Sequence, residues 1–146
     1  MGERVELGRI IYTVFETQWM TQIGLGLDAK IPQNRFFLVR LSAANAGIAD
    51  VLAPGLTLVD DDGRAYAEFP NGEGAPNWLG ILRQVKPAEA AQGSVVFDVP
   101  PRHYKLRLTD ENEQKAAFVD LPLVLTPEAP ELPIPNTAKE PPPIRK

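Results

Sequence analysis

Residues 35–44 read RFFLVRLSAA, and this stretch predicts a β-strand at the centre of a sheet. Its aromatic and β-branched side chains favour extended backbone. Successive side chains of a strand point to opposite faces, which gives two apolar sets: Phe37, Val39 and Leu41, and opposite them Phe36 and Leu38. Because both faces are apolar, we expect this strand to be buried on both sides.

Shorter segments on either side of it show the alternation of apolar and polar residues that is typical of half-buried strands. In YKLRL, residues 104–108, the apolar side chains share one face and two basic side chains take the other. The strands expected on this basis cover residues 5–7, 10–15, 35–44, 56–59, 64–69, 94–99, 104–108 and 117–124. No stretch keeps a 3.6-residue period. The sequence therefore predicts an all-β fold, an antiparallel β-sandwich of seven or eight strands.

A cluster of three carboxylates lies between two of these strands, in Asp60-Asp61-Asp62-Gly63. Asp-Gly supplies the positive φ angles of a tight primed hairpin turn. Three carboxylates could also bind Ca²⁺, which prefers oxygen ligands, but the spacing of an EF-hand loop is missing. We therefore interpret the cluster as a solvated turn and keep calcium binding as the lesser alternative.

Prolines divide the chain into two parts. Eight of the 15 prolines fall between residues 121 and 146. Because proline lacks a backbone N–H and has a fixed φ, we expect a sandwich domain over residues 1–126 and a Pro-rich disordered tail over residues 127–146.

Composition excludes several classes of chemistry. The chain has no cysteine and one histidine, which removes disulfides, thiol catalysis and zinc sites built on Cys or several His. A net charge of -4 gives no basic patch for nucleic acid. No apolar run is long enough to span a membrane, and the first residues, MGERVEL, contain no secretory leader. No cofactor is predicted.

Two loops are longer than a hairpin needs, residues 16–33 and 70–78. Binding sites on rigid sandwiches are commonly placed on such loops. The first loop is expected to contain Trp19, and the second contains Asn77 and ends at Trp78. These three residues are the candidate binding residues. The alternative is that each tryptophan closes an end of the core.

His103 is the one side chain expected to titrate near neutral pH. A catalytic site there would need a carboxylate within reach, and Asp98 and Glu68 are the candidates. The sequence contains no nucleophile elbow or comparable arrangement, so we expect a histidine at a strand end and no enzymatic activity.

Four stretches, taken together, resemble the DUF4352 group of bacterial exported domains, also called telokin-like extracellular domains. They are Val5-Glu6-Leu7-Gly8 continuing to Tyr12-Thr13-Val14; residues 37–47, FLVRLSAANAG; residues 56–66, LTLVDDDGRAY; and Val85-Lys86-Pro87 leading to residues 93–100, GSVVFDVP. The resemblance implies an immunoglobulin-like sandwich, related in fold to a mycobacterial secreted antigen. It also implies an extracytoplasmic setting, secreted, periplasmic or anchored by a lipid attached upstream. It implies no catalytic residues.

The function expected from these observations is a non-enzymatic binding module of the bacterial cell envelope. Its partner would be a protein, a peptide or a glycan bound through the end loops. Two alternatives remain: a structural spacer domain, and an enzyme with a site near His103.

Overall fold

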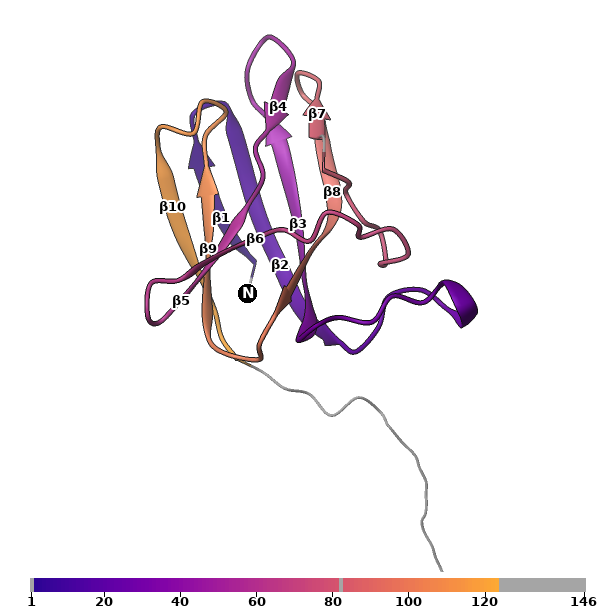
Figure 1. The fold of residues 1–146 in the computed structure, drawn as a ribbon. Helices are drawn as coiled ribbons and strands as arrows, with labels where there is room; N and C mark the ends of the chain where they lie inside the picture. The colour runs from indigo at the N-terminus through magenta and orange to yellow at the C-terminus, as the bar shows by residue number, and fades with distance from the viewer. Residues whose placement is uncertain (1, 82, 124–146) are drawn as a thin grey trace, which may run out of the picture.

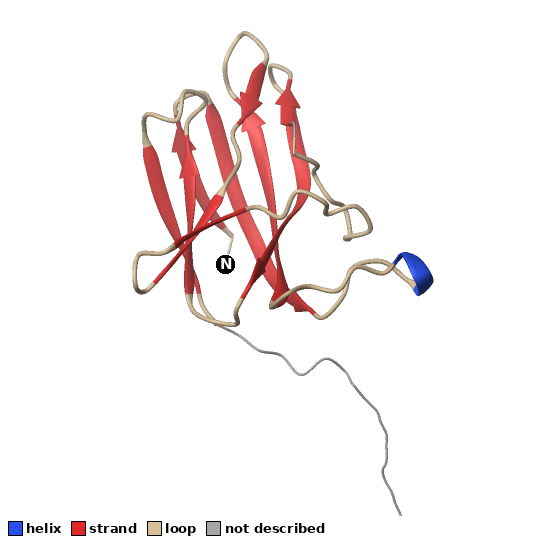
Figure 2. Cartoon of the chain, viewed as in Figure 1, coloured by secondary structure: helices blue, strands red, loops and turns tan. Residues whose placement is uncertain are grey.

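The computed structural model describes residues 2–81 and 83–123, which form two antiparallel four-stranded sheets packed face to face (Figures 1 and 2). The first sheet has the order β1 (Glu3–Leu7), β2 (Ile10–Met20), β3 (Arg35–Asn45), β8 (Ala90–Val99). The second has the order β10 (Ala116–Leu121), β9 (Tyr104–Thr109), β5 (Thr57–Asp60), β6 (Ala65–Ala67). The all-β, immunoglobulin-like sandwich expected from the sequence is confirmed.

Strand β3 is the interior strand that its sequence predicts, paired with β2 on one side and β8 on the other. One of its faces contributes Phe37, Val39 and Leu41 to the main core between the sheets. The opposite face contributes Phe36 and Leu38 to a second, smaller core on the outside of the sheet. Both faces are buried because loops cover the outer one.

Strand β2 is longer than predicted and runs through Trp19 to Met20. Its pairing with β3 shifts register between Val14 and Glu16, which marks a β-bulge at Phe15. The extra residue moves the inward positions from even to odd numbers and breaks the apolar alternation. The sequence pattern therefore ends at the bulge, although the strand does not.

The hairpin predicted around the three aspartates is confirmed as β5 paired with β6. The turn type was predicted wrongly. Of the turn residues, Gly63 alone has a positive φ, +83°, and its amide donates to the Asp60 carbonyl. This is a three-residue loop, in which a glycine in the left-handed region follows an ordinary turn.

Two strands were not predicted, β4 (Val51–Ala53) and β7 (Arg83–Val85), which pair as a two-stranded ribbon. Three residues are too few to show a period. A 3₁₀ turn, η1 (Gly26–Asp28), lies in the loop between β2 and β3. No described helix is long and apolar enough to cross a membrane. The predicted tail, residues 127–146, lies outside the described residues.

Candidate functional site

Trp19 does not lie in a loop, as the sequence analysis expected, but near the end of strand β2. Its side chain is 8 % exposed and its ring centroid lies 4.3 Å from that of Phe37. The ring also lies 6.4 Å from Tyr104 of the opposite sheet. Trp19 is therefore part of the main core, and its placement follows from the bulge that continues β2.

Trp78 is half-buried and packs onto the second core, on the outer face of the first sheet. Its indole lies directly over Gly72, where an added Cβ would meet the ring Nε1 at 2.4 Å. The Trp78 and Ser94 positions form a parallel bridge. The loop of residues 70–80, which we name the covering loop, is thus held on the sheet by its own tryptophan.

Asn77 is exposed and has a φ of +54°. Its backbone carbonyl accepts a hydrogen bond of 2.8 Å from the Ser94 amide of β8. The carbonyl lies so close to Gly93 that a Cβ there would approach it to 2.2 Å. Glycine at position 93 is therefore what allows the covering loop to pair with the strand.

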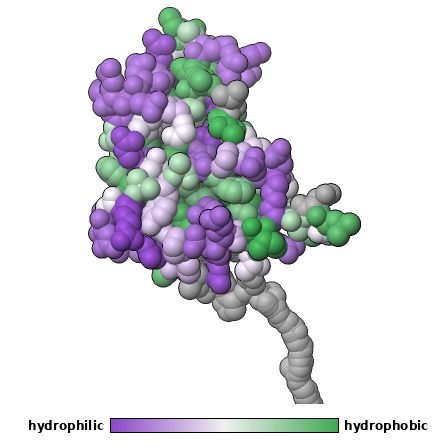
Figure 3. All heavy atoms as spheres, in the orientation of Figure 1, coloured by the Kyte–Doolittle hydropathy of each residue, from purple (hydrophilic) through white to green (hydrophobic). Residues whose placement is uncertain are grey.

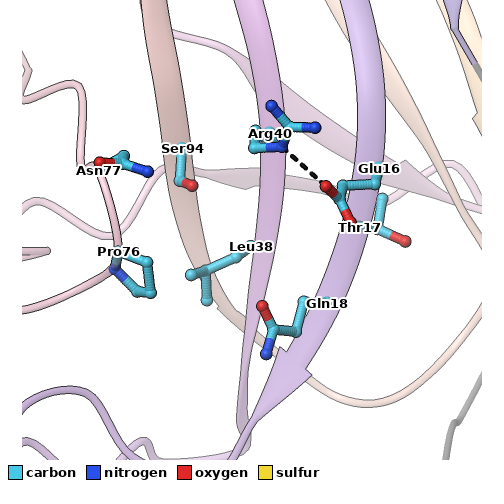
Figure 4. Close-up of a pocket in the computed structure, with 8 residues that line it drawn as sticks. All are labelled: Glu16, Thr17, Gln18, Leu38, Arg40, Pro76, Asn77 and Ser94. Carbon is cyan, nitrogen blue, oxygen red and sulfur yellow. Dashed lines mark hydrogen bonds and ion pairs between the residues drawn. The ribbon is translucent and has the colours of Figure 1, made fainter.

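Between the covering loop and strands β2 and β3 the surface is hollowed (Figure 4). This outer hollow has a volume of about 90 Å³. Its lining residues are Glu16, Thr17, Gln18, Leu38, Arg40, Pro76, Asn77 and Ser94. Of the three predicted binding residues, Asn77 is the one that lines it. The other seven lining residues could not be identified as a group from the sequence, because the lining comes from three strands and a loop that are far apart along the chain.

The loop between β2 and β3 ends in an apolar tip on the same side of the molecule as the covering loop (Figures 1 and 3). Leu25 is 86 % exposed, Leu27 is fully exposed and Ile31 is 71 % exposed. These three residues, which we name the aliphatic tip, belong to the loop that the sequence singled out. These residues were not among the predicted binding residues; the signal for Leu25 and Leu27 is their alternation with glycines in GLGL, residues 24–27.

The base of the aliphatic tip is braced. Ile23 and Lys30 exchange two backbone hydrogen bonds, of 3.0 and 2.7 Å, and the Ile23 side chain is completely buried. The Lys30 ammonium donates to the carbonyls of Asn71 and Glu73, at 2.8 and 2.9 Å. The two long loops are therefore tied together. Leu25 and Leu27 lie between the two braced residues, and Ile31 directly follows Lys30.

The carboxylate of Asp60 is used by the hairpin turn. It accepts hydrogen bonds from the amides of Asp62 and Arg64, both at 2.9 Å, and from the Tyr66 hydroxyl at 3.1 Å. Burial alone would raise the pKa of Asp60, but these hydrogen bonds outweigh it and hold the pKa below its ordinary value. Among the described residues, no group of three or more acidic or histidine side chains is arranged to hold a metal ion.

His103 lies between two carboxylates other than those expected. Its Nδ1 is 2.7 Å from Asp61 and its Nε2 is 2.5 Å from Asp120. The hydrogen bonds to Asp61 and then Asp120 raise the pKa of His103. A ring that donates from both nitrogens is protonated and has no free nitrogen to act as a base.

The two carboxylates proposed as partners of His103 have other contacts. Asp98 accepts hydrogen bonds from the backbone amides of Gln33 and Asn34, at 2.8 and 2.9 Å. Glu68 forms an ion pair with the buried Arg83. The structure therefore does not bring together the catalytic group that was considered around His103.

The two sheets, their antiparallel order and the loops around them define an immunoglobulin-like β-sandwich. The chain belongs to the DUF4352 family, described as a domain of unknown function, which it matches over residues 1–116. This confirms the resemblance drawn from the four sequence stretches. A comparison with curated proteins finds no match.

Solved structures share the fold at low sequence identity. The yjhA protein from Bacillus subtilis is 16 % identical, with a TM-score of 0.62 over 84 % of this chain and 98 % of that one. An uncharacterized β-sandwich protein from Clostridium difficile is 10 % identical, with a TM-score of 0.55 over 84 % and 91 %. A putative lipoprotein from Bacillus subtilis is 12 % identical, with a TM-score of 0.62 over 82 % of this chain and 38 % of its own longer chain.

Proposed function

We propose that this domain is a non-enzymatic binding module of the bacterial cell envelope that contacts a protein partner through its aliphatic tip. The observation that carries the proposal is the exposure of Leu25, Leu27 and Ile31 on a loop whose base is fixed. A large aliphatic side chain in water forgoes about 1.5–3 kcal/mol of burial free energy. Burying three such side chains of one loop against a partner would therefore contribute favourably to binding.

The braced base supports a binding role for the tip. A loop that is already ordered loses less conformational entropy when it binds, so more of the contact free energy appears as affinity. Here Ile23 is anchored in the second core and Lys30 links the loop to the neighbouring carbonyls. The sandwich supplies the rigid support, and the tip supplies the contact.

The envelope location rests on the family and on one neighbour. The family resemblance implies an extracytoplasmic setting, and a protein of the same fold is described as a putative lipoprotein. His103, Asp60, Asp98 and Glu68 are each engaged in contacts that do not form a catalytic group. We therefore favour a binding domain over an enzyme. The other alternative is a structural spacer domain. It would give the exposed aliphatic tip no partner to contact.

Site-specific photocrosslinking tests the proposal. A photoreactive phenylalanine analogue is placed at Leu27, and as a matched control at Ile48, which is 95 % exposed in a different loop. In intact bacteria that express the protein, we expect a discrete protein adduct from position 27 and none from position 48. The absence of an adduct at position 27, or identical adducts at both positions, would contradict the proposal.

A further inference from the structure

The outer hollow contains side-chain hydrogen-bonding groups that have no partner among the described residues 2–81 and 83–123. Among its eight lining residues, the one hydrogen bond between side chains joins Arg40 Nε to Glu16, at 2.8 Å (Figure 4). In Figure 4 the amides of Gln18 and Asn77 and the Ser94 hydroxyl lie around the open space. These groups offer both donors and acceptors. They can therefore bind a ligand group that itself carries a hydrogen-bond donor and an acceptor.

The floor of the hollow is apolar. Leu38 is 3 % exposed and lies between the polar side chains of the rim. Pro76 adds a second apolar surface from the covering loop. A ligand group that fits must therefore combine a small apolar part with a donor and an acceptor.

The charge of the site favours a neutral ligand. Arg40 is the cation of the rim, and Glu16 neutralises it in the ion pair. The Arg40 guanidinium also lies 4.9 Å from the centre of the Phe15 ring, which holds it in place. An anion or a cation would have to compete with this pair.

The hollow has room for a small ligand group. Its volume of about 90 Å³ is several times the ~10–15 Å³ that one water molecule needs on the same measure. An acetamido group, with a methyl, a carbonyl and an N–H, is small enough to enter and has the required chemistry.

The backbone around the hollow excludes recognition by strand addition. Strand β3 is paired on both sides, and β8 is paired with β3 and with the backbone of Asn77 and Leu79. An extended peptide binds a sheet by hydrogen bonding to an unpaired edge. The hollow lies on a sheet face, so recognition there depends on side chains.

We propose that the outer hollow binds the acetamido group of an N-acetylated sugar. The methyl group would contact Leu38, the amide would bond to Gln18, Asn77 and Ser94, and the sugar ring would lie at the open rim beside Glu16 and Arg40. The proposal does not rest on the aliphatic tip, and either can fail without the other.

Titration of the ¹⁵N-labelled full chain with N-acetylglucosamine, followed by NMR, tests it. We expect saturable shifts of the side-chain amide signals of Gln18 and Asn77 and of the Arg40 Nε–H, with a dissociation constant in the millimolar range that is ordinary for so small a contact. Glucose, which lacks the acetamido group, should produce no saturable shift. Equal binding of glucose, or no saturable shift with N-acetylglucosamine, would overturn the proposal.

Two variants make the test specific. Asn77→Gly removes the amide at a position whose φ of +54° glycine adopts without strain, and should weaken binding about tenfold or more. Gln92→Ala, an exposed amide on the same strand as Ser94 but outside the hollow, should bind as the wild type does. Unchanged binding by Asn77→Gly would overturn the assignment. N-acetylglycine amide serves as a peptide-like probe. If it shifts the same signals with the same dissociation constant as N-acetylglucosamine, the ligand would be a peptide and the proposal of a sugar would be overturned.

Discussion

The covering loop, residues 70–80, and the loop between β2 and β3 lie side by side but place their apolar residues differently. The covering loop turns Ala75 and Trp78 inward, onto the second core. The neighbouring loop turns Ile23 inward and leaves its aliphatic tip in solvent. Folding explains the inward apolar residues of both loops and leaves only the aliphatic tip of the second loop without a role in the described core. The two loops therefore differ in whether their apolar side chains are used by the fold or left exposed.

The largest loss of stability is expected from removing Trp78, which anchors the covering loop. Trp78→Ala deletes the indole that packs on the second core and over Gly72, and should lower the free energy of unfolding by about 3 kcal/mol. Urea denaturation followed by circular dichroism measures the loss. A change below 1 kcal/mol would show that the covering loop is not structural.

The second-largest loss of stability is expected from a substitution at the base of the loop between β2 and β3. Ile23 is completely buried, so Ile23→Ala leaves a cavity and should cost about 2–3 kcal/mol. The same denaturation measurement checks it. If the cost were no larger than that of a surface substitution, the base of the tip would not be braced.

A smaller loss is expected where the covering loop meets β8. In Gly93→Ala the new methyl group would clash with the Asn77 carbonyl, at a cost of about 1–3 kcal/mol. Hydrogen exchange of the Ser94 amide, which donates to that carbonyl, should become faster as well. Wild-type stability together with slow exchange would contradict the close approach.

A small, pH-dependent effect on stability is expected at His103, which lies in the connection between β8 and β9, outside both loops. Because the pKa of His103 is raised in the folded protein, the stabilisation is complete below its unfolded pKa of about 6.5 and is lost as the pH rises through the folded value. The melting temperature of the wild type should exceed that of His103→Gln at pH 5.5, and the difference should shrink at alkaline pH. A difference that grows with pH would contradict the assigned contacts.

The smallest effect on stability is expected from the aliphatic tip. Replacing Leu25, Leu27 and Ile31 together by serine should change the free energy of unfolding by no more than about 0.5 kcal/mol. The same variant should lose the photocrosslinked adduct when the probe is placed at Thr21, an exposed position on the same loop. A large loss of stability would mean that the tip belongs to the fold.

Much of the fold could be predicted from local pattern. The two apolar faces of residues 35–44 predicted an interior strand, and the Asp-Gly pair predicted a hairpin. The pattern failed at Phe15, where a bulge changes which side chains face inward, and this error placed Trp19 in a loop. The turn at Gly63 was given the wrong type because the sequence shows where a positive φ is easy, not how many residues adopt it.

The candidate site was less accessible to sequence reasoning. Asn77 was identified, but Gln18, Arg40 and Ser94 join it only through the pairing of three strands. His103 was expected beside Asp98 or Glu68 and instead contacts Asp61 and Asp120. Such contacts depend on register between distant segments, which local alternation does not determine.

The central claim is that the aliphatic tip is exposed in the isolated domain and covered in its native setting. The chain has no cysteine, so a single cysteine can be labelled without interference. Leu27→Cys and the control Ile48→Cys are reacted with a maleimide, once as purified proteins and once in intact bacteria that express them. We predict equal, fast labelling of both purified proteins and, in the bacteria, labelling of Leu27→Cys at least tenfold slower than that of Ile48→Cys. Equal labelling of the two positions in the bacteria would contradict the claim.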